Sequence, residues 1–74
     1  MSPALTDLPV RKVTRALESA GFAYVRTKGS HCVYRHRDGR AAVVPDHGVV
    51  KRGTLGSILR QAGIKPGEFL KLLG

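Results

Sequence analysis

The spacing of the apolar residues changes twice along this chain, and this change limits the folds that the chain can adopt. Between residues 9 and 20 the apolar residues recur every three or four positions, on one face of a helix: Val10, Val13, Leu17 and Ala20. Pro9 suits the first turn of this helix, and Gly21 is placed to cap its end. From residue 22 the period falls to two, which is typical of half-buried strands.

Residues 22–44 predict three antiparallel strands joined by two tight turns. The turns are Lys28-Gly29 and Asp38-Gly39, because glycine tolerates the positive φ that such turns need. The second strand runs through residues 30–36 and the third through residues 41–44. The three strands therefore form one small antiparallel sheet.

Strict alternation predicts which side chains share a face of this sheet. In the first strand, Arg26 is expected on the same face as Phe22. In the second strand, Cys32 and Tyr34 share a face that the helices can cover, so core packing is the expected role of both. The opposite face of that strand carries His31, Val33 and Arg35.

The remaining residues predict a loop and two more helices. Residues 46–53 read as the loop, and Thr54 is placed to cap the helix that follows. The buried stripe of that helix consists of Leu55, Ile58, Leu59 and Ala62. Gly63 ends this helix, and Pro66 opens a short last helix that brings further apolar side chains to the core.

These elements predict a single α+β domain over residues 9–74, in the order helix, three-stranded antiparallel sheet, helix and short C-terminal helix. Residues 1–8 are expected to form a loosely ordered N-terminal lead. A chain of 74 residues is one domain, and such a chain buries only roughly 60% of its unfolded surface. There is no room for a deep cofactor pocket, and no cofactor is expected.

The charge balance restricts the class of partner. Thirteen Lys and Arg residues against five Asp and Glu give a formal net charge of +8, so the expected partners are polyanions or an acidic protein. The single cysteine leaves no CxxC pair for a zinc site, and we expect no metal. The N-terminus has no long apolar run, which predicts neither a signal peptide nor a membrane span and favours the cytoplasm.

One segment combines a histidine with a dense basic environment: "RTKGSHCVYRHRDGR", residues 26–40. We call Gly29, Ser30 and His31 the GSH turn. His31 follows the glycine at the head of an apolar strand, and Lys28 is the nearest cation in the sequence.

Five segments of the chain come in an order that resembles the HicA family of toxins from bacterial toxin-antitoxin pairs: "ALESAGF", "VRTKGSHCVYRHRDGR", "AVVP", "GTLGSILRQAGI" and "EFLKLL". The GSH turn followed by the "GTLGSILRQAGI" helix is the most specific part of this resemblance. The resemblance implies a fold like a double-stranded-RNA-binding domain and an endoribonuclease activity against mRNA that arrests translation. It also implies a neutralising HicB-type antitoxin, with operator DNA bound only through that antitoxin, and it assigns the functional histidine to His31.

The chemistry of RNA gives a separate reason for a histidine at this turn. RNA is cut without a metal when its own 2′-hydroxyl attacks the adjacent phosphate, and that reaction needs proton transfers. Imidazole, whose unperturbed pKa is about 6.5, exchanges protons near neutral pH, and a positioned general acid or base contributes roughly 10² to 10⁴ in rate. Lys28 and the amides of Gly29 and Ser30 are candidates to stabilise the charge on the phosphate.

The other candidate residues have alternatives that stay open. His47, in the loop, is either structural or a substrate contact or second proton-transfer group, and Lys51 and Arg52 are candidates to hold RNA. His36 is expected at a solvated strand end. For the whole protein, the alternatives to an enzyme are an RNA-binding module without catalysis and an inactive subunit that works only with its antitoxin on operator DNA.

Overall fold

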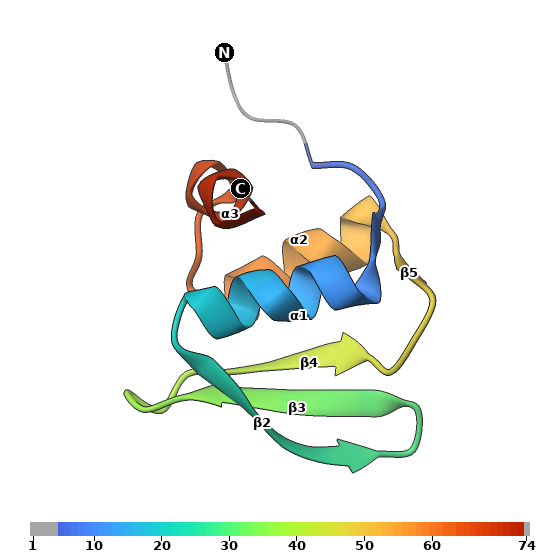
Figure 1. Cartoon of the computed structure of the whole chain (residues 1–74), viewed down its shortest axis with the longest axis vertical. Helices are drawn as coiled ribbons and strands as arrows, with labels where there is room; N and C mark the ends of the chain where they lie inside the picture. The colour runs from blue at the N-terminus through green and yellow to red at the C-terminus, as the bar shows by residue number, and fades with distance from the viewer. Residues whose placement is uncertain (1–4, 74) are drawn as a thin grey trace.

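A layer of helices covers one face of a three-stranded sheet in this computed structural model, which describes residues 5–73 (Figure 1). The sheet has the order β2-β3-β4, with β2 at Phe22–Lys28, β3 at His31–His36 and β4 at Ala41–Pro45. The helices are α1 at Val10–Ser19, α2 at Arg52–Ala62 and α3 at Pro66–Leu73. This arrangement confirms the predicted α+β class and the predicted order of these elements.

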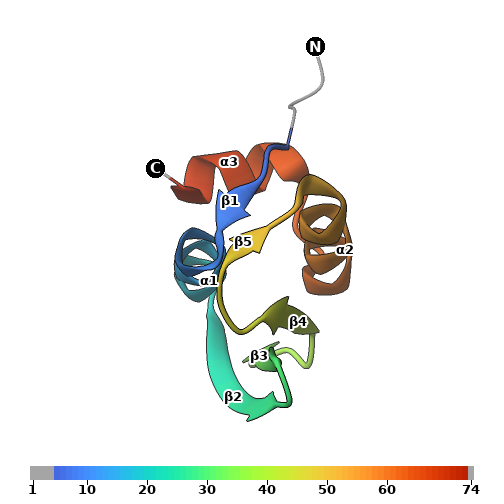
Figure 2. The same cartoon turned by 90° about the vertical axis from the view of Figure 1, so that its right-hand side faces the viewer.

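The core lies between the sheet and the helices. We call the face of the sheet turned toward the helices the inner face and the opposite one the outer face; Figure 2 shows the helices on one side of the sheet only. Cys32 and Tyr34 are buried on the inner face, as predicted, and burial raises the pKa of the Tyr34 hydroxyl. The largest fully buried side chains come from all layers: Phe69, Leu17, Leu55, Ile58, Leu59, Val13, Val44 and Val50.

A β-bulge interrupts the alternation of β2. The register shifts between Tyr24 and Arg26, so that Arg26 pairs with Val33 and Thr27 pairs with Cys32. Thr27 therefore joins the inner face, where its hydroxyl lies 3.5 Å from the Cys32 sulfur. Arg26 lies on the outer face with Val33, and the prediction that it shares a face with Phe22 was wrong. A bulge of this kind inserts one residue and reverses the faces beyond it.

A second, two-stranded sheet pairs the end of the N-terminal segment with a segment that was predicted to be a loop. β1, at Leu8–Pro9, pairs antiparallel with β5, at Val49–Val50, and Val50 is fully buried. The structure thus differs from the expected loop at residues 46–53. It also differs from the expected loose lead, because Leu5 and Leu8 pack against the core; residues 1–4 lie outside the described residues.

The N-terminus of α2 is capped from a distance. The prediction that Thr54 caps this helix was wrong: the helix begins at Arg52, and Lys51 occupies the cap position without a side-chain hydrogen bond. Asp7 supplies the missing acceptor, because its Oδ1 accepts a hydrogen bond of 2.9 Å from the Arg52 amide. A carboxylate at this position satisfies one free amide and offsets the positive end of the helix dipole.

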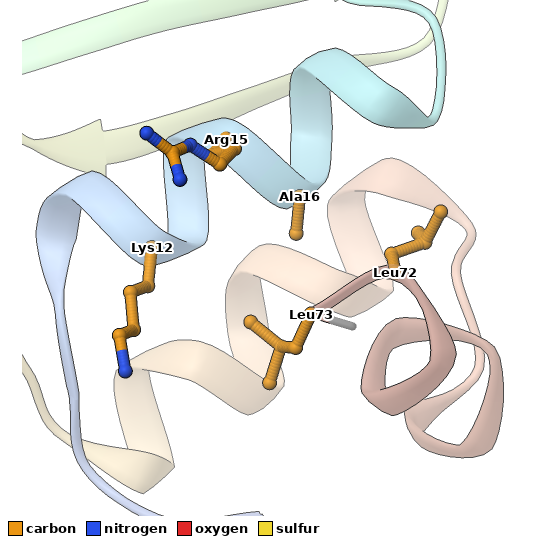
Figure 3. A pocket seen from close by; sticks show the side chains of 5 residues that line it. All are labelled: Lys12, Arg15, Ala16, Leu72 and Leu73. Carbon is orange, nitrogen blue, oxygen red and sulfur yellow. The ribbon is translucent and has the colours of Figure 1, made fainter.

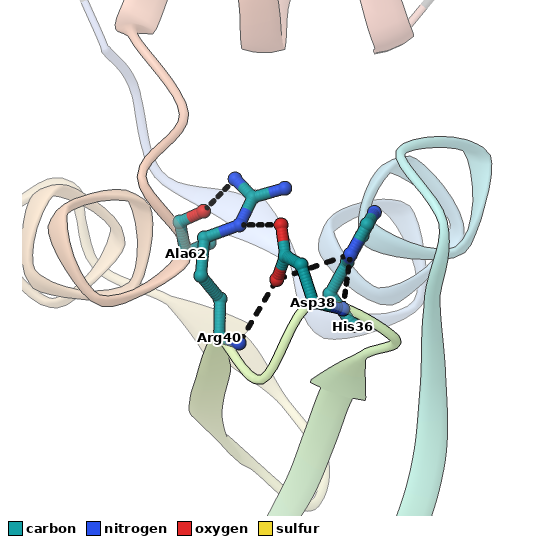
Figure 4. Close-up of polar contacts among 4 residues, drawn as sticks. All are labelled: His36, Asp38, Arg40 and Ala62. Carbon is teal, nitrogen blue, oxygen red and sulfur yellow. Dashed lines mark hydrogen bonds and ion pairs between the residues drawn. The ribbon is translucent and has the colours of Figure 1, made fainter.

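The β3–β4 hairpin is tied to the end of α2 by the side chains in Figure 4. Arg40 donates from Nη1 to the Ala62 carbonyl at 2.6 Å and from Nε to Asp38 at 2.8 Å. The Arg40 amide donates to Asp38 as well, and this bond is the main reason that the pKa of Asp38 is lowered. His36 accepts the Asp38 amide at Nδ1 and packs edge-on against Phe22, so the expected solvated strand end was wrong.

Of the remaining helix ends, the start of α1 differs from the prediction, because Pro9 lies in β1 as the N-cap residue and the helix begins at Val10. The other ends follow the prediction. Gly21 follows the C-cap of α1 with a φ of 97°, and Gly63 caps α2 with a φ of 68°. Pro66 opens α3, and Phe69 from this helix is fully buried. Within residues 5–73, none of the helices is long and apolar enough to span a membrane.

Candidate functional site

The GSH turn connects β2 to β3 at one end of the sheet. Lys28 is the last residue of β2 and His31 the first of β3, and the two are partners across the strand pair. Gly29 adopts a φ of 62°, the left-handed region that glycine reaches without strain. His31 is exposed on the outer face, opposite to Cys32 on the same strand. An exposed imidazole and an ammonium group therefore stand at the same edge of the turn.

The loop after β4 begins beside the GSH turn. Pro45 is the register partner of His31 on β4, and the Asp46 amide donates a hydrogen bond of 2.8 Å to the Ser30 carbonyl. His47 follows directly and is exposed. The structure thus places the start of the loop that carries His47 against the turn that carries His31. These two segments are far apart in the sequence, since Cys32 and Asp46 are 14 positions apart.

A second hydrogen bond also holds Asp46 beside the GSH turn. Cys32 donates from its sulfur to Asp46 Oδ1 at 3.2 Å, and Cys32 is only 8% exposed. Together with the backbone bond to Ser30, this contact holds Asp46 at two points. The Asp46 carboxylate thus contacts Cys32, whose side chain is buried on the inner face. We call the two bonds the Asp46 clasp.

Lys51 and Arg52 belong to a different part of the molecule. They follow β5, and Figure 2 shows the β1–β5 pair above the sheet, next to the helices. The Lys51 ammonium lies 3.7 Å from Asp7 Oδ2, and the Arg52 amide binds the same carboxylate. The contacts of these two residues therefore tie the N-terminal strand to α2. The structure does not bring them into contact with the GSH turn.

Sequence reasoning missed one residue that the fold adds to the neighbourhood of His31. Arg26 lies on the outer face because of the bulge, two positions from Lys28 on the same strand. Arg35 shares that face, as the alternation of β3 predicted. The sequence of β2 gives no signal for the bulge. Val25 is an ordinary strand residue, and the pattern around it fits a strand with or without an inserted residue.

A shallow groove lies elsewhere, between α1 and α3 (Figure 3). It is lined by Lys12, Arg15, Ala16, Leu72 and Leu73 and has a volume of about 90 Å³. Small-molecule pockets usually measure about 300 to 1,000 Å³, so this groove is too small for a cofactor. The described part of the chain also holds no group of three or more His, Cys, Asp or Glu side chains that could bind a metal ion.

The positive φ of Gly29 gives a direct test of the turn. Gly29→Val is expected to cost about 1–2 kcal/mol, because a β-branched residue is strained in the left-handed region. For a domain of this size, that cost corresponds to a fall of roughly 5–15 °C in Tm. The matched control is Gly53→Ala in α2, where φ is not positive and no atom lies within 4 Å of the added Cβ. That change is expected to raise the Tm slightly. Equal melting of the Gly29→Val variant and the wild type would contradict the strained turn.

No match was found among curated proteins. A family model described as the HicA toxin of bacterial toxin-antitoxin matches residues 10–64, which run from the start of α1 to just beyond α2 and include the GSH turn. Because this match covers most of the 74-residue chain, the protein belongs to the HicA family, the toxins of bacterial toxin-antitoxin pairs.

Proposed function

We propose that this toxin is an endoribonuclease that cleaves mRNA without a metal ion and thereby arrests translation. The observation that carries the proposal is the exposed His31 at the head of β3, facing Lys28 across the GSH turn in a member of a toxin family. A histidine exposed at such a turn is free to approach a phosphodiester. Imidazole is the side-chain group that general acid-base catalysis most often uses.

The reaction we propose is an internal displacement at phosphorus. The 2′-hydroxyl oxygen forms a bond to the adjacent phosphorus while its proton passes to a general base, and the bond from phosphorus to the 5′ oxygen breaks. The leaving 5′ oxygen takes a proton from a general acid. The products are a 2′,3′-cyclic phosphate and a 5′-hydroxyl. Lys28 and the amides of Gly29 and Ser30 would stabilise the extra negative charge on the phosphate.

This reaction needs two proton-transfer groups, and His31 is assigned to one of them. His47 is our candidate for the other, because the Asp46 clasp holds the start of its loop against the GSH turn. Lys28 and a water molecule are the alternatives for this second role. Lys51 and Arg52, beyond β5, would only make outlying contacts to the RNA backbone.

The antitoxin is the expected partner of a toxin of this family. We propose that a HicB-type antitoxin neutralises the toxin by covering the segment from Lys28 to His31 with acidic or hydrogen-bonding groups, and that operator DNA is reached only through it. Coverage is expected because the turn is exposed on a chain of net charge +8. A crystal structure of the complex with this turn open to solvent would refute simple occlusion.

The experiment that tests the activity uses a labelled mRNA, with and without EDTA. Wild-type protein is expected to cleave it equally in both, to leave cyclic-phosphate ends, and to leave DNA of the same sequence intact, because DNA has no 2′-hydroxyl. Binding of the RNA without cleavage would instead favour a non-catalytic RNA-binding module. If the protein neither binds nor cleaves the RNA, the result would favour a subunit that acts only with its antitoxin on operator DNA.

A further inference from the structure

The outer face of the three-stranded sheet is not covered by any described helix, as Figure 2 shows. The helices contact the sheet from the other side, where the core lies. The strand registers place these residues on the outer face: Ala23, Arg26, Lys28, His31, Val33, Arg35, Ala41, Val43 and Pro45. Val43, at the middle of β4, is 40% exposed. A whole side of the molecule is thus open to a ligand.

The charged groups on this face all have the same sign. Arg26, Lys28 and Arg35 are exposed, and none of the three forms an ion pair with any residue between positions 5 and 73. No Asp or Glu is among the outer-face residues. Asp46 follows Pro45, the last outer-face residue of β4, but its carboxylate accepts a hydrogen bond from Cys32 on the inner face. A polyanion would therefore meet positive charges and no carboxylate on this face.

The three cations lead away from His31 in a regular pattern. Lys28 lies across the strand pair from His31, Arg26 lies two positions further along β2, and Arg35 lies four positions from His31 along β3. A strand rises about 3.3 Å per residue, so these positions fall at about 7 Å and 13 Å from the end at the GSH turn. The arrangement offers successive contacts to an extended chain of phosphates that crosses the sheet and ends at His31.

Apart from the imidazole of His31, the aromatic side chains of the sheet lie on its other face. Phe22, Tyr24 and Tyr34 belong to the inner face, and Tyr24 packs edge-on against Tyr34. Sheets that read single-stranded RNA by sequence stack bases on aromatic side chains of their open face. The small and aliphatic side chains of the outer face, such as Val33 and Val43, cannot provide such stacking. Contacts on this face would therefore go to phosphates, which carry no sequence information.

We propose that the outer face is the binding track for single-stranded RNA, with backbone phosphates on Arg26, Lys28 and Arg35 and with little preference for base sequence. The proposal rests on the proposed ribonuclease function for its choice of ligand. It assigns to Arg26 and Arg35 a binding role that lies outside the GSH turn. It also makes the bulge in β2 a functional feature, because the bulge brings Arg26 to this face.

The test measures binding of a fluorescent 2′-O-methyl RNA dodecamer of mixed sequence by anisotropy. This RNA lacks a free 2′-hydroxyl and cannot be cleaved by the proposed reaction, so the result does not depend on the proposed function. The test variant is Arg26→Gln/Arg35→Gln, and the matched control is Arg11→Gln/Arg15→Gln on the exposed side of α1, with the same loss of charge. Homopolymer dodecamers of U, C and A measure base preference.

The outer-face variant is expected to bind at least about ten-fold more weakly and to reduce the salt slope by about 1.4, or about 0.7 for each lost phosphate contact. The control variant is expected to change the affinity less than about three-fold. The affinities of the wild-type protein for the three homopolymers are also expected to lie within about three-fold of one another. Equal weakening in both variants would overturn the proposal, as would absence of wild-type binding at low salt. Loss of antitoxin affinity with unchanged RNA affinity would also overturn it and would make this face a protein interface.

Discussion

Replacing His31 with alanine is expected to slow RNA cleavage strongly while the protein keeps its fold. The His31 side chain is exposed and makes no hydrogen bond within residues 5–73, so its removal leaves the core unchanged. If His31 supplies a proton-transfer group, the rate should fall by roughly 10² to 10⁴. Single-turnover cleavage of a labelled mRNA in EDTA measures the rate, and thermal melting of the same sample checks the fold.

Two other histidines provide the controls for this result. His47→Ala should also slow cleavage if His47 is the second group, and the loss of either group should remove one limb of the pH–rate profile. His36→Ala should lower the Tm instead, because His36 packs against Phe22 and binds the Asp38 amide. Cleavage by the His31→Ala variant at the wild-type rate, with the same products, would remove His31 from the mechanism.

Replacing Phe69 with alanine is expected to have the largest effect on stability. Phe69 is fully buried in α3, and a Phe→Ala change in a core costs about 3–5 kcal/mol. A small domain has about 5–15 kcal/mol of total stability, so the variant should be largely unfolded in moderate urea. Urea unfolding followed by circular dichroism measures this change.

The neighbouring residue offers a matched control. Leu70 is on the same helix and is 39% exposed, so Leu70→Ala should cost less than about 1.5 kcal/mol. Similar urea midpoints for the two variants would show that α3 is not part of the cooperative core. The comparison matters because α3 lies beyond residues 10–64, the part that matches the family model.

The predicted elements that depend on nearby residues were confirmed. The 3.6-residue period of α1, the glycine after it and the proline at the start of α3 are local signals, and each marks the element that the structure contains. The position of His31 opposite to Cys32 on β3 also followed from alternation alone.

The features that depend on residues far apart in the sequence were not predicted. The β1–β5 pair joins Leu8 to Val50, and each strand has only two residues, which is too short for a period to be visible. Asp7 caps a helix that begins 45 positions later, so the local search for a cap selected Thr54.

The candidate site shows the same division between local and distant information. The sequence placed Lys28, Ser30 and His31 together because they are neighbours in the chain. It left the position of His47 open, and the Asp46 clasp, which brings that loop to the turn, became visible only in the structure. Arg26 was assigned to the wrong face because a single inserted residue reverses every side chain beyond it.

The two edges of the sheet differ in how they meet other strands. The β4 edge is occupied, because Gln61 of α2 accepts the Val43 amide at 3.0 Å. The β2 edge is open within residues 5–73, and an open edge can recruit a strand from another molecule and start aggregation. Here the bulge distorts the edge, and the edge strand carries the charged residues Arg26 and Lys28. The bulge that turns Arg26 to the outer face therefore also makes the β2 edge a poor template for a further strand.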